Sequence, residues 1–534
     1  MSAPDRLTQA ISDAYDETPY ISLPFSYTAP GSLRAVAQLY GISTPEVQRA
    51  RVLELGCAAG GNLLPFALAY PEARVVGVDL SPQQIEAGKR AAEAAGARNL
   101  DLQAMSLTEI TPAFGTFDYI ICHGVFSWVQ PEVRDAILRI CKANLAPDGV
   151  AYISYNTYPG WKASDVIRDA MLLNSFGAQT PQEKLARAKD MLGLIENGLW
   201  ENNHLQSALQ HTAQKLRGQS DHYLAHEYLE AVNTPCYFLE FAAAAQQMGL
   251  AYLADAEPQL SFPSLYGAKV TQGLNAISAN AGREMREQYL DFAVGRSFRK
   301  SLVVHAERTD TIREKPEGGF FNEMYLASDV RALPAAAKTP AHEREYLSPR
   351  GATLKTQDPI GHCLIEVLRQ AWPQSVSFDD LRKAAREIAP GATPDELTGA
   401  ILGNVLTLVQ SNALYYRLEP ISYQAPTSTP TLIHGARDLL NETARPDCQV
   451  GMHNLWHLNV VPPTDALSRH IMGLIDGRRS TTELRTATRE ALQSGRYMHP
   501  NGQSYKGVRN LEPVVQPFVD ALLSELRRIG LLVN

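Results

Sequence analysis

Short apolar runs alternate with amphipathic helical patterns along residues 51–155. The runs are rich in β-branched residues, which predicts strands at 51–55, 74–79, 100–103, 117–122 and 150–155. Helical spacing of apolar positions predicts helices at 62–70, 81–95 and 132–145. The pair Ser81-Pro82 suits the N-cap and first turn of the second helix. Strands that alternate with helices predict a parallel, Rossmann-like α/β sheet.

The strands that complete such a sheet are separated from the first five by a long stretch of sequence. Residues 162–228 have a helical pattern throughout. A helix at 237–248, a strand at 250–255 and a last strand at 298–305 follow. We therefore interpret the helical stretch as an insertion into the α/β domain, which then continues to about Thr309.

Beyond Arg313 the pattern changes to two modules that look like winged helices, at 378–418 and 466–533. A stretch rich in Pro, Ser and Thr at 424–430 reads as a linker between them. The predicted division of the chain is an N-terminal lid segment 1–50, a cofactor-binding core 51–161, a helical insertion 162–235, a sheet completion 236–309, and winged-helix-like domains 310–423 and 431–534.

Composition narrows the function classes. The chain has 534 residues, a hydrophobic fraction of 45% and a charged fraction of 20%, which are typical of a globular protein of several domains. Its formal net charge is −8, so the chain lacks the excess of basic residues with which nucleic-acid-binding proteins contact phosphates. The six cysteines form no C-x-x-C pair, so no metal site is expected. No apolar run is long enough to span a membrane, and we expect a cytoplasmic protein.

The central chemical motif is a glycine-rich turn that follows the first strand. Its spacing is G-x-G-x-G with Ala58 in the middle position, and it lacks the third glycine of the dinucleotide fingerprint, which favours S-adenosylmethionine. Asp79 ends the second strand, where a carboxylate can accept hydrogen bonds from ribose hydroxyls, and Leu80 would flank the adenine. The residues that the turn assigns to cofactor binding are Glu54, Gly56, Cys57, Ala58, Gly60 and Asn62.

After the third strand, methyltransferases with this type of glycine-rich turn commonly present an acidic residue to the adenine amine, and this chain departs from that pattern. It has Met105, which can pack on adenine, and Ser106, which can accept a hydrogen bond from the amine.

Two aromatic-rich loops follow the fourth and fifth strands, at the same edge of the sheet. We expect their exposed side chains to surround the methyl group, although aromatic residues at such seams are often simple packing. These side chains are His123, Trp128, Asn156, Tyr158 and Trp161, of which His123 is assigned to the cofactor.

With these residues in hand, the chain resembles methyltransferases that carry a methyltransferase regulatory domain, including the rickettsial protein-lysine methyltransferases. The segments that carry the resemblance are 15–30, 123–128, 155–161, 226–229 and 235–238. The resemblance covers about residues 13–309, including a regulatory region within 236–309. The C-terminal modules resemble this family only in their general pattern of apolar and polar residues.

The resemblance implies transfer of a methyl group from S-adenosylmethionine to the ε-amine of lysines on a partner protein, in that family outer-membrane surface proteins. A lysine amine attacks only when neutral, so its pocket must desolvate it and offer acceptors for its proton. Tyr15, Tyr20, Tyr155 and Tyr158 would form the lysine channel, and Asn156 would align the amine.

Two other functions stay open on the sequence. One is a methyltransferase that acts on a small molecule, because the sheet and cofactor loop do not specify the acceptor. The other is a cofactor-binding scaffold without turnover. We also expect residues 1–50 to fold over the cofactor as a lid or to pack as a plain helix, and the apolar faces of 162–228 to pair with a second copy in a homodimer.

Overall fold

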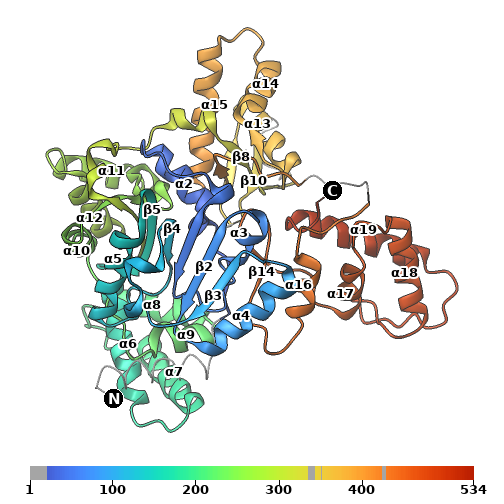
Figure 1. The fold of residues 1–534 in the computed structure, drawn as a ribbon, viewed down its shortest axis with the longest axis horizontal. Coiled ribbons are helices and arrows are strands. Elements are labelled where there is room, and N and C mark those ends of the chain that lie inside the picture. Colours follow the sequence, from blue (N-terminus) through green and yellow to red (C-terminus); the bar gives the residue numbers. More distant parts are fainter. Residues whose placement is uncertain (1–20, 335–342, 350, 424–428, 534) are drawn as a thin grey trace.

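The computed structural model describes residues 21–334, 343–349, 351–423 and 429–533. Its centre is a seven-stranded sheet in the order β3-β2-β1-β4-β5-β7-β6 (Figure 1). The strands are β1 (Arg51–Leu55), β2 (Arg74–Asp79), β3 (Leu100–Ala104), β4 (Phe117–Cys122), β5 (Leu145–Asn156), β6 (Leu250–Asp255) and β7 (Phe298–His305). Strand β7 is antiparallel to β5 and β6, and the pairs from β3 to β5 are parallel. The predicted Rossmann-like sheet and its two late strands are confirmed.

Helices cover both faces of this sheet, and the strand order reverses between β1 and β4. The helices are α3 (Leu64–Ala69), α4 (Pro82–Ala95), α5 (Pro131–Asn144), α10 (Phe238–Gln247), α11 (Ala268–Ile277) and α12 (Arg283–Val294). Ser81 caps α4 as predicted, because its hydroxyl accepts a hydrogen bond from the Gln84 backbone N–H at 3.1 Å. Ligands bind such sheets at the carboxyl ends of the strands beside the reversal, which is where the glycine-rich turn lies.

The stretch between β5 and β6 is helical, as its pattern predicts. It forms α6 (Trp161–Ser175), α7 (Pro181–Asn197), α8 (Gln206–Arg217) and α9 (Asp221–Tyr228), at the lower end of the molecule in Figure 1. These helices share an apolar core of their own, which includes Ile167, Met171 and Leu216. The insertion is therefore a separately packed subdomain attached to the catalytic sheet.

The N-terminal and C-terminal parts of the chain meet beside the sheet. Helix α2 (Pro30–Leu39) contacts both the sheet and the C-terminal half, so the packing-helix alternative holds for this part of the predicted lid. The first C-terminal module contains β8 (Tyr325–Ala327), β9 (Arg331–Ala332), β10 (Arg344–Leu347), β11 (Thr353–Thr356), α13 (Pro359–Ala371), β12 (Val376–Ser377), α14 (Phe378–Ile388), α15 (Pro394–Gln410) and β13 (Tyr415–Arg417). Its three helices pack beside the small antiparallel sheet β12-β8-β13.

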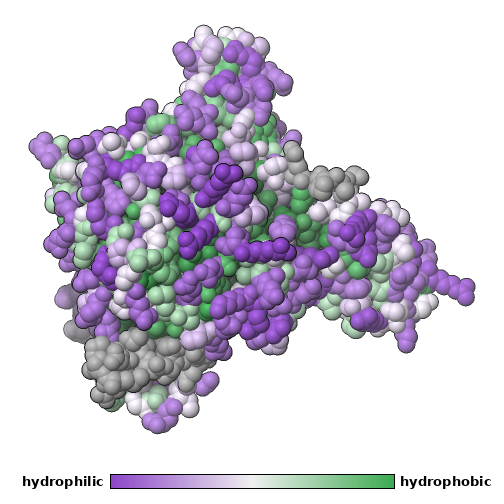
Figure 2. Space-filling view, in the orientation of Figure 1, coloured by the Kyte–Doolittle hydropathy of each residue, from purple (hydrophilic) through white to green (hydrophobic). Residues whose placement is uncertain are grey.

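The last module projects to the right of the sheet in Figure 1, where its first helix packs on α4. It contains α16 (Ala436–Glu442), β14 (Met452–His453), β15 (Asn459–Val460), α17 (Ala466–Gly473), α18 (Thr481–Gln493) and α19 (Glu512–Arg528). The assignment of both modules as winged helices, like the domain boundaries, stays a prediction. Figure 2 shows hydrophobic residues mainly around the central sheet, whereas the projecting modules are mostly hydrophilic on this face. Every helix in the described ranges is too short or too polar to cross a bilayer.

Candidate functional site

The glycine-rich turn brings its backbone unusually close to its neighbours. Gly56, Ala58 and Gly60 have φ angles of 72°, 49° and 71°, a region that favours glycine and that costs free energy at Ala58. A Cβ atom on Gly56 would lie 2.4 Å from Val125, and one on Gly61 would lie 2.1 Å from the Ser22 carbonyl oxygen. The glycines therefore allow a close approach of the backbone at the sheet edge. Most N–H groups of the turn are used inside the protein: those of Gly56 and Cys57 donate to the Val78 carbonyl, and that of Gly61 donates to Ser22.

Asp79 is fixed at the end of β2 by the turn itself. Its carboxylate accepts hydrogen bonds from the backbone N–H of Ala58 at 2.8 Å and of Ser81 at 3.0 Å. Both Asp79 and Leu80 keep partial exposure. A carboxylate held in this way and facing solvent has the position that the sequence predicts for a ribose contact.

Glu54 is buried at the base of the turn, and its pKa is raised. Its Oε1 accepts a hydrogen bond from the Asn62 amide at 2.7 Å, while its Oε2 has no partner within the described residues. Burial raises the pKa of Glu54 to about 8, the Asn62 bond opposes this rise, and the charge of Asp79 adds to it. An orphaned, buried carboxyl oxygen fits a cationic ligand group such as an ammonium.

Cys57 is part of the turn, but its side chain does not face the ligand position. Its side chain is buried toward β2, where a Cβ atom on Gly77 would lie 2.7 Å from its sulfur. Only the backbone of Cys57 is therefore positioned for a ligand, and burial raises the pKa of its thiol.

The segment 22–28, which ends in a 3-10 helix at Ser26–Thr28, lies against the turn and joins it to the last module of the chain. The Ser22 hydroxyl accepts from the Gly61 N–H at 2.8 Å, and the Ser22 N–H donates to the Gln449 carbonyl at 2.7 Å. The Asn62 amide oxygen accepts from the Phe25 N–H at 3.0 Å and from Thr28 at 2.9 Å, and it lies 3.3 Å from His457 Nε2. Sequence reasoning missed Ser22 and His457, because neither belongs to a local motif.

The loop after β3 places Met105 and Ser106 beside Asp79. The Met105 N–H donates to the Asp79 carbonyl at 2.9 Å, and the Met105 side chain is partly buried. Ser106 is the N-cap of a short 3-10 helix, η3 (Leu107–Glu109), and its hydroxyl lies 2.8 Å from that of Thr108. This local capping explains Ser106 without a ligand, so its adenine contact stays a prediction.

His123 lies at the centre of an aromatic group at the same edge. Its ring centroid is 4.2 Å from that of Phe25 and 5.7 Å from that of Tyr27, and its Nδ1 is 3.0 Å from the Tyr152 hydroxyl. Burial, followed by the nearby charge of Lys300, lowers the pKa of His123 to about 3. His123 is therefore neutral at physiological pH and presents a polar but uncharged surface.

The end of strand β5 and the loop after it differ in part from the predicted acceptor channel. Tyr155 is buried on the opposite face of the sheet, where its ring stacks on Phe241 at 4.3 Å, so its assignment to the channel was wrong. Trp161 is also buried, against Tyr228, and the packing alternative holds for it. Tyr15 and Tyr20 lie outside the described residues.

Asn156 and Tyr158 remain candidates, with different surroundings. Asn156 is 3% exposed, against the expectation that it is exposed, and its amide donates to Asn233 Oδ1 at 3.1 Å. The Tyr158 hydroxyl donates to Asp165 at 2.8 Å, and the Lys162 ammonium lies 3.6 Å from the Tyr158 ring centroid. Trp128 is half-buried beside the insertion core.

Two family models match the chain. A methyltransferase domain model matches residues 52–149, and a predicted methyltransferase regulatory domain model matches residues 220–305. The uncharacterized protein RP789 of Rickettsia prowazekii is 34% identical over 446 residues, which cover 80% of this chain and 79% of the relative. RP028 of the same organism is 42% identical over 236 residues, 44% of this chain and 94% of the relative.

The structure of PKMT2 from Rickettsia typhi in complex with AdoHcy is similar over almost the whole chain. Its TM-score is 0.82 at 28% identity, with 97% of this chain and 100% of that chain covered. Ubiquinone biosynthesis O-methyltransferase of Actinobacillus pleuropneumoniae, in contrast, is 30% identical over 108 residues, which are 20% of this chain and 44% of the relative. The broad likeness thus includes the modules outside the catalytic sheet.

Proposed function

Because the chain belongs to the family of class I S-adenosylmethionine-dependent methyltransferases that carry a methyltransferase regulatory domain, we propose that it methylates lysine side chains of a partner protein. The observation that carries this proposal is the extent of the likeness to PKMT2, which covers 97% of the chain. The small-molecule O-methyltransferases match only 20–23% of it. A bacterial outer-membrane surface protein is the partner that the family resemblance suggests.

The residues at the sheet edge fit S-adenosylmethionine, which supplies an electrophilic methyl group when bound. We assign Asp79 to the ribose hydroxyls and Glu54 to the amino group of the methionine part, since Glu54 Oε2 is buried without a partner in the described chain. Leu80 and Met105 would flank the adenine, and Ser106 would accept from its amine. In this assignment the backbone of residues 56–60 contacts the cofactor directly.

The acceptor side needs an uncharged amine, because an ammonium has no lone pair with which to attack. The neutral His123 and the buried Asn156 are polar groups that would orient such an amine without competing for its proton. The face of the Tyr158 ring carries the Lys162 ammonium, and the Tyr158 hydroxyl donates to Asp165, so Tyr158 would border the acceptor site rather than bind the amine itself.

The test is to incubate the purified protein with methyl-labelled S-adenosylmethionine and a mixture of bacterial surface proteins, and to map labelled residues by mass spectrometry. We expect labelled lysines that disappear with Asp79→Ala and persist with Asp101→Ala, an exposed aspartate on the neighbouring strand β3. Label confined to small molecules would favour the small-molecule alternative. Cofactor binding without any labelled product would favour the scaffold alternative.

We also propose that the helical insertion pairs with a second copy of the chain. Large apolar side chains are exposed on it, with Leu173 at 76%, Phe176 at 85% and Trp200 at 69% exposure. We expect a dimer by light scattering, and we expect Phe176→Asp to give monomers. A wild-type protein that is monomeric at micromolar concentration would contradict this proposal.

A further inference from the structure

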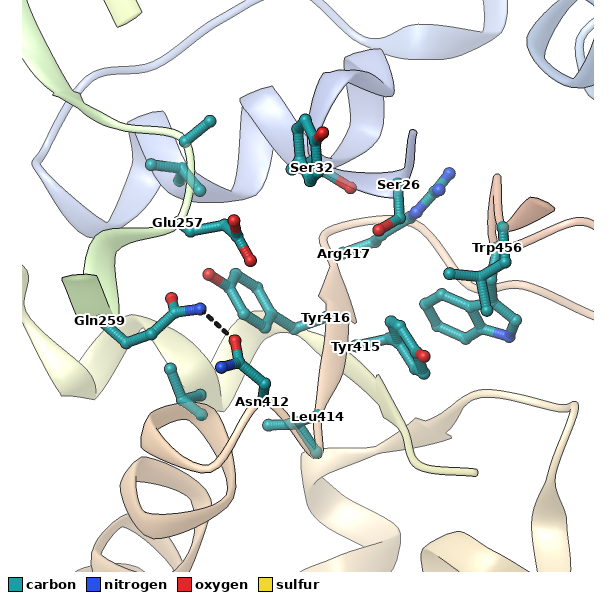
Figure 3. Close-up of a pocket in the computed structure, with 15 residues that line it drawn as sticks. Ser26, Ser32, Glu257, Gln259, Asn412, Leu414, Tyr415, Tyr416, Arg417 and Trp456 are labelled. Carbon is teal, nitrogen blue, oxygen red and sulfur yellow. Dashed lines mark hydrogen bonds between the residues drawn. The ribbon is translucent and has the colours of Figure 1, made fainter. Parts of the chain in front are cut away.

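A cavity of about 120 Å³ lies beside the cofactor edge and outside the glycine-rich turn (Figure 3). It is partly open, and it is lined by four segments that are distant in sequence: the 3-10 helix η1 (Ser26–Thr28) with α2, the residues after β6, the stretch 409–417 from the end of α15 through β13, and the loop at 456–458. An engineered cavity of about 150 Å³ holds a molecule the size of benzene. This cavity therefore fits the end of one side chain and is too small for the cofactor.

The walls combine aromatic rings with a carboxylate. Figure 3 shows Glu257 and the hydroxyl end of Tyr416 close together on one side, and Tyr415 with Trp456 on the other. The Tyr415 and Trp456 ring centroids are 5.8 Å apart. Burial, followed by the nearby negative charge of Glu257, raises the pKa of Tyr416. Such rings would cover an aliphatic stem, and the carboxylate and hydroxyl would meet a polar end.

The cavity shares a wall with the predicted methyl-transfer site. Tyr27 lines the cavity, and its ring centroid lies 5.7 Å from that of His123, the loop residue after β4. The Lys300 ammonium pairs with Glu257 and lies 4.7 Å from the Tyr27 ring centroid. Lys300 also contributes to the low pKa of His123, so its charge acts on both sides of this wall.

We propose that this cavity receives the side chain of the acceptor lysine, in its neutral form, on the way to the methyl group. The proposal rests on the proposed function and names the part of the site that selects the acceptor. The four-carbon stem lies against the rings of Tyr27, Tyr415 and Trp456. The nitrogen meets Glu257 and the Tyr416 hydroxyl.

The charges around the cavity favour an amine over an ammonium. The titratable and charged groups that line the cavity are Tyr27 of η1, Glu257 after β6, and Tyr415, Tyr416 and Arg417 of β13. Behind them, Lys300 of β7 pairs with Glu257, and its charge also acts on His123 after β4 and on Asp255 at the end of β6. Glu257 is already paired with Lys300, and Arg417 adds a second positive charge at the wall. Burial raises the pKa of Asp255, which weakens its negative charge at this end. Since Glu257 is committed to Lys300, a further ammonium next to Lys300 and Arg417 is disfavoured, which lowers the pKa of an entering lysine below its usual value of about 10.4.

The experiment measures binding of three probes to the full chain saturated with AdoHcy: N-α-acetyl-lysine methylamide, its Nε-trimethyl derivative and N-α-acetyl-norleucine methylamide. We expect the lysine probe to bind more tightly as pH rises from 7 to 10. We expect the permanently charged trimethyl probe and the norleucine probe to bind at least tenfold more weakly than the lysine probe at pH 9. Equal or tighter binding of the trimethyl probe, or no binding of the lysine probe, would overturn the proposal.

Ser32→Leu fills the cavity from α2 without removing a side chain of the cofactor site. We expect Ser32→Leu to weaken binding of the lysine probe at least tenfold while AdoHcy binding is unchanged. The control Gln38→Leu, on the same helix, should change neither the binding of the lysine probe nor that of AdoHcy. If Ser32→Leu still binds the probe like wild type, the cavity is not the site. Lysine methylation of surface proteins that proceeds at wild-type KM in Ser32→Leu would overturn this inference but leave the proposed function standing.

Discussion

Replacing Glu54 by Gln should make the protein more stable and its cofactor binding weaker. The carboxyl is 3% exposed, and its pKa rises from the usual 4.5 to about 8. When folding raises the pKa of a carboxyl group, the folded protein is most stable below the unfolded pKa, where the group is protonated in both states. The free energy of unfolding then falls as pH rises toward the folded pKa, because only the unfolded state ionises freely. Glu54 therefore costs stability progressively between pH 4.5 and pH 8.

The size of this cost follows from the pKa of about 8 and the usual 4.5. Since one pKa unit corresponds to 1.36 kcal/mol, the wild-type protein loses about 3 kcal/mol at pH 7 but less than about 1 kcal/mol at pH 5. Glutamine keeps an acceptor for the Asn62 amide and cannot ionise. We expect Glu54→Gln to raise the free energy of unfolding by these amounts, measured by urea denaturation at both pH values without cofactor.

Cofactor binding should change in the opposite direction. If Glu54 pairs with the amino group of the cofactor, losing this charged hydrogen bond costs about 1.5–3 kcal/mol, or roughly 10- to 150-fold in Kd. Wild-type binding at pH 7 should also release nearly one proton, which calorimetry in buffers of different ionisation enthalpy detects, and Glu54→Gln should release none. The exposed control Glu93→Gln should resemble wild type. The same Kd and proton release in Glu54→Gln would refute the assignment of Glu54.

Three further variants test individual contacts. Gly61→Ala places a Cβ 2.1 Å from the Ser22 carbonyl, so we expect a loss of about 1–3 kcal/mol in stability and weaker AdoHcy binding by calorimetry; an unchanged melting temperature would contradict the close approach. His457→Ala removes the contact with Asn62, and AdoHcy should bind about 2- to 10-fold more weakly, while the exposed Val461→Ala serves as its control. Tyr158→Phe should keep the methylation rate within about fivefold, since its hydroxyl is committed to Asp165; a larger loss would show that the hydroxyl acts in the reaction.

The sheet and the cofactor turn are predictable from sequence because their signals are local. A strand pattern, a glycine spacing and an aspartate about 20 residues downstream lie within one βαβ unit. The error at Tyr155 was avoidable by the same local logic. Side chains alternate along β5, so Tyr155 points to the face opposite Tyr152 and Ser154, both of which lie within 3.2 Å of His123 Nδ1.

Other features depend on contacts that no local pattern encodes. His457 meets Asn62 across 395 residues of sequence, and Trp161 stacks on Tyr228 at 5.6 Å from another helix of the insertion. Ser106 shows a different limit: a serine followed three residues later by Glu109 is a capping box, and this local role competes with the ligand role that the motif suggests. Residue type alone does not decide between the two.

The contacts of the segment 22–28 connect the cofactor turn to the C-terminal module. Ser22 bonds to Gly61 on one side and exchanges backbone hydrogen bonds with Gln449 and Gly451 on the other. Asn62 joins this segment to both Glu54 and His457. A cofactor that pairs with Glu54 therefore acts on the network that holds the C-terminal module. By linkage, any change in cofactor affinity that a partner of this module causes is matched by an equal change in the affinity of that partner caused by the cofactor. This reciprocity gives the C-terminal module a physical route to methyl transfer even though it supplies no residue of the glycine-rich turn.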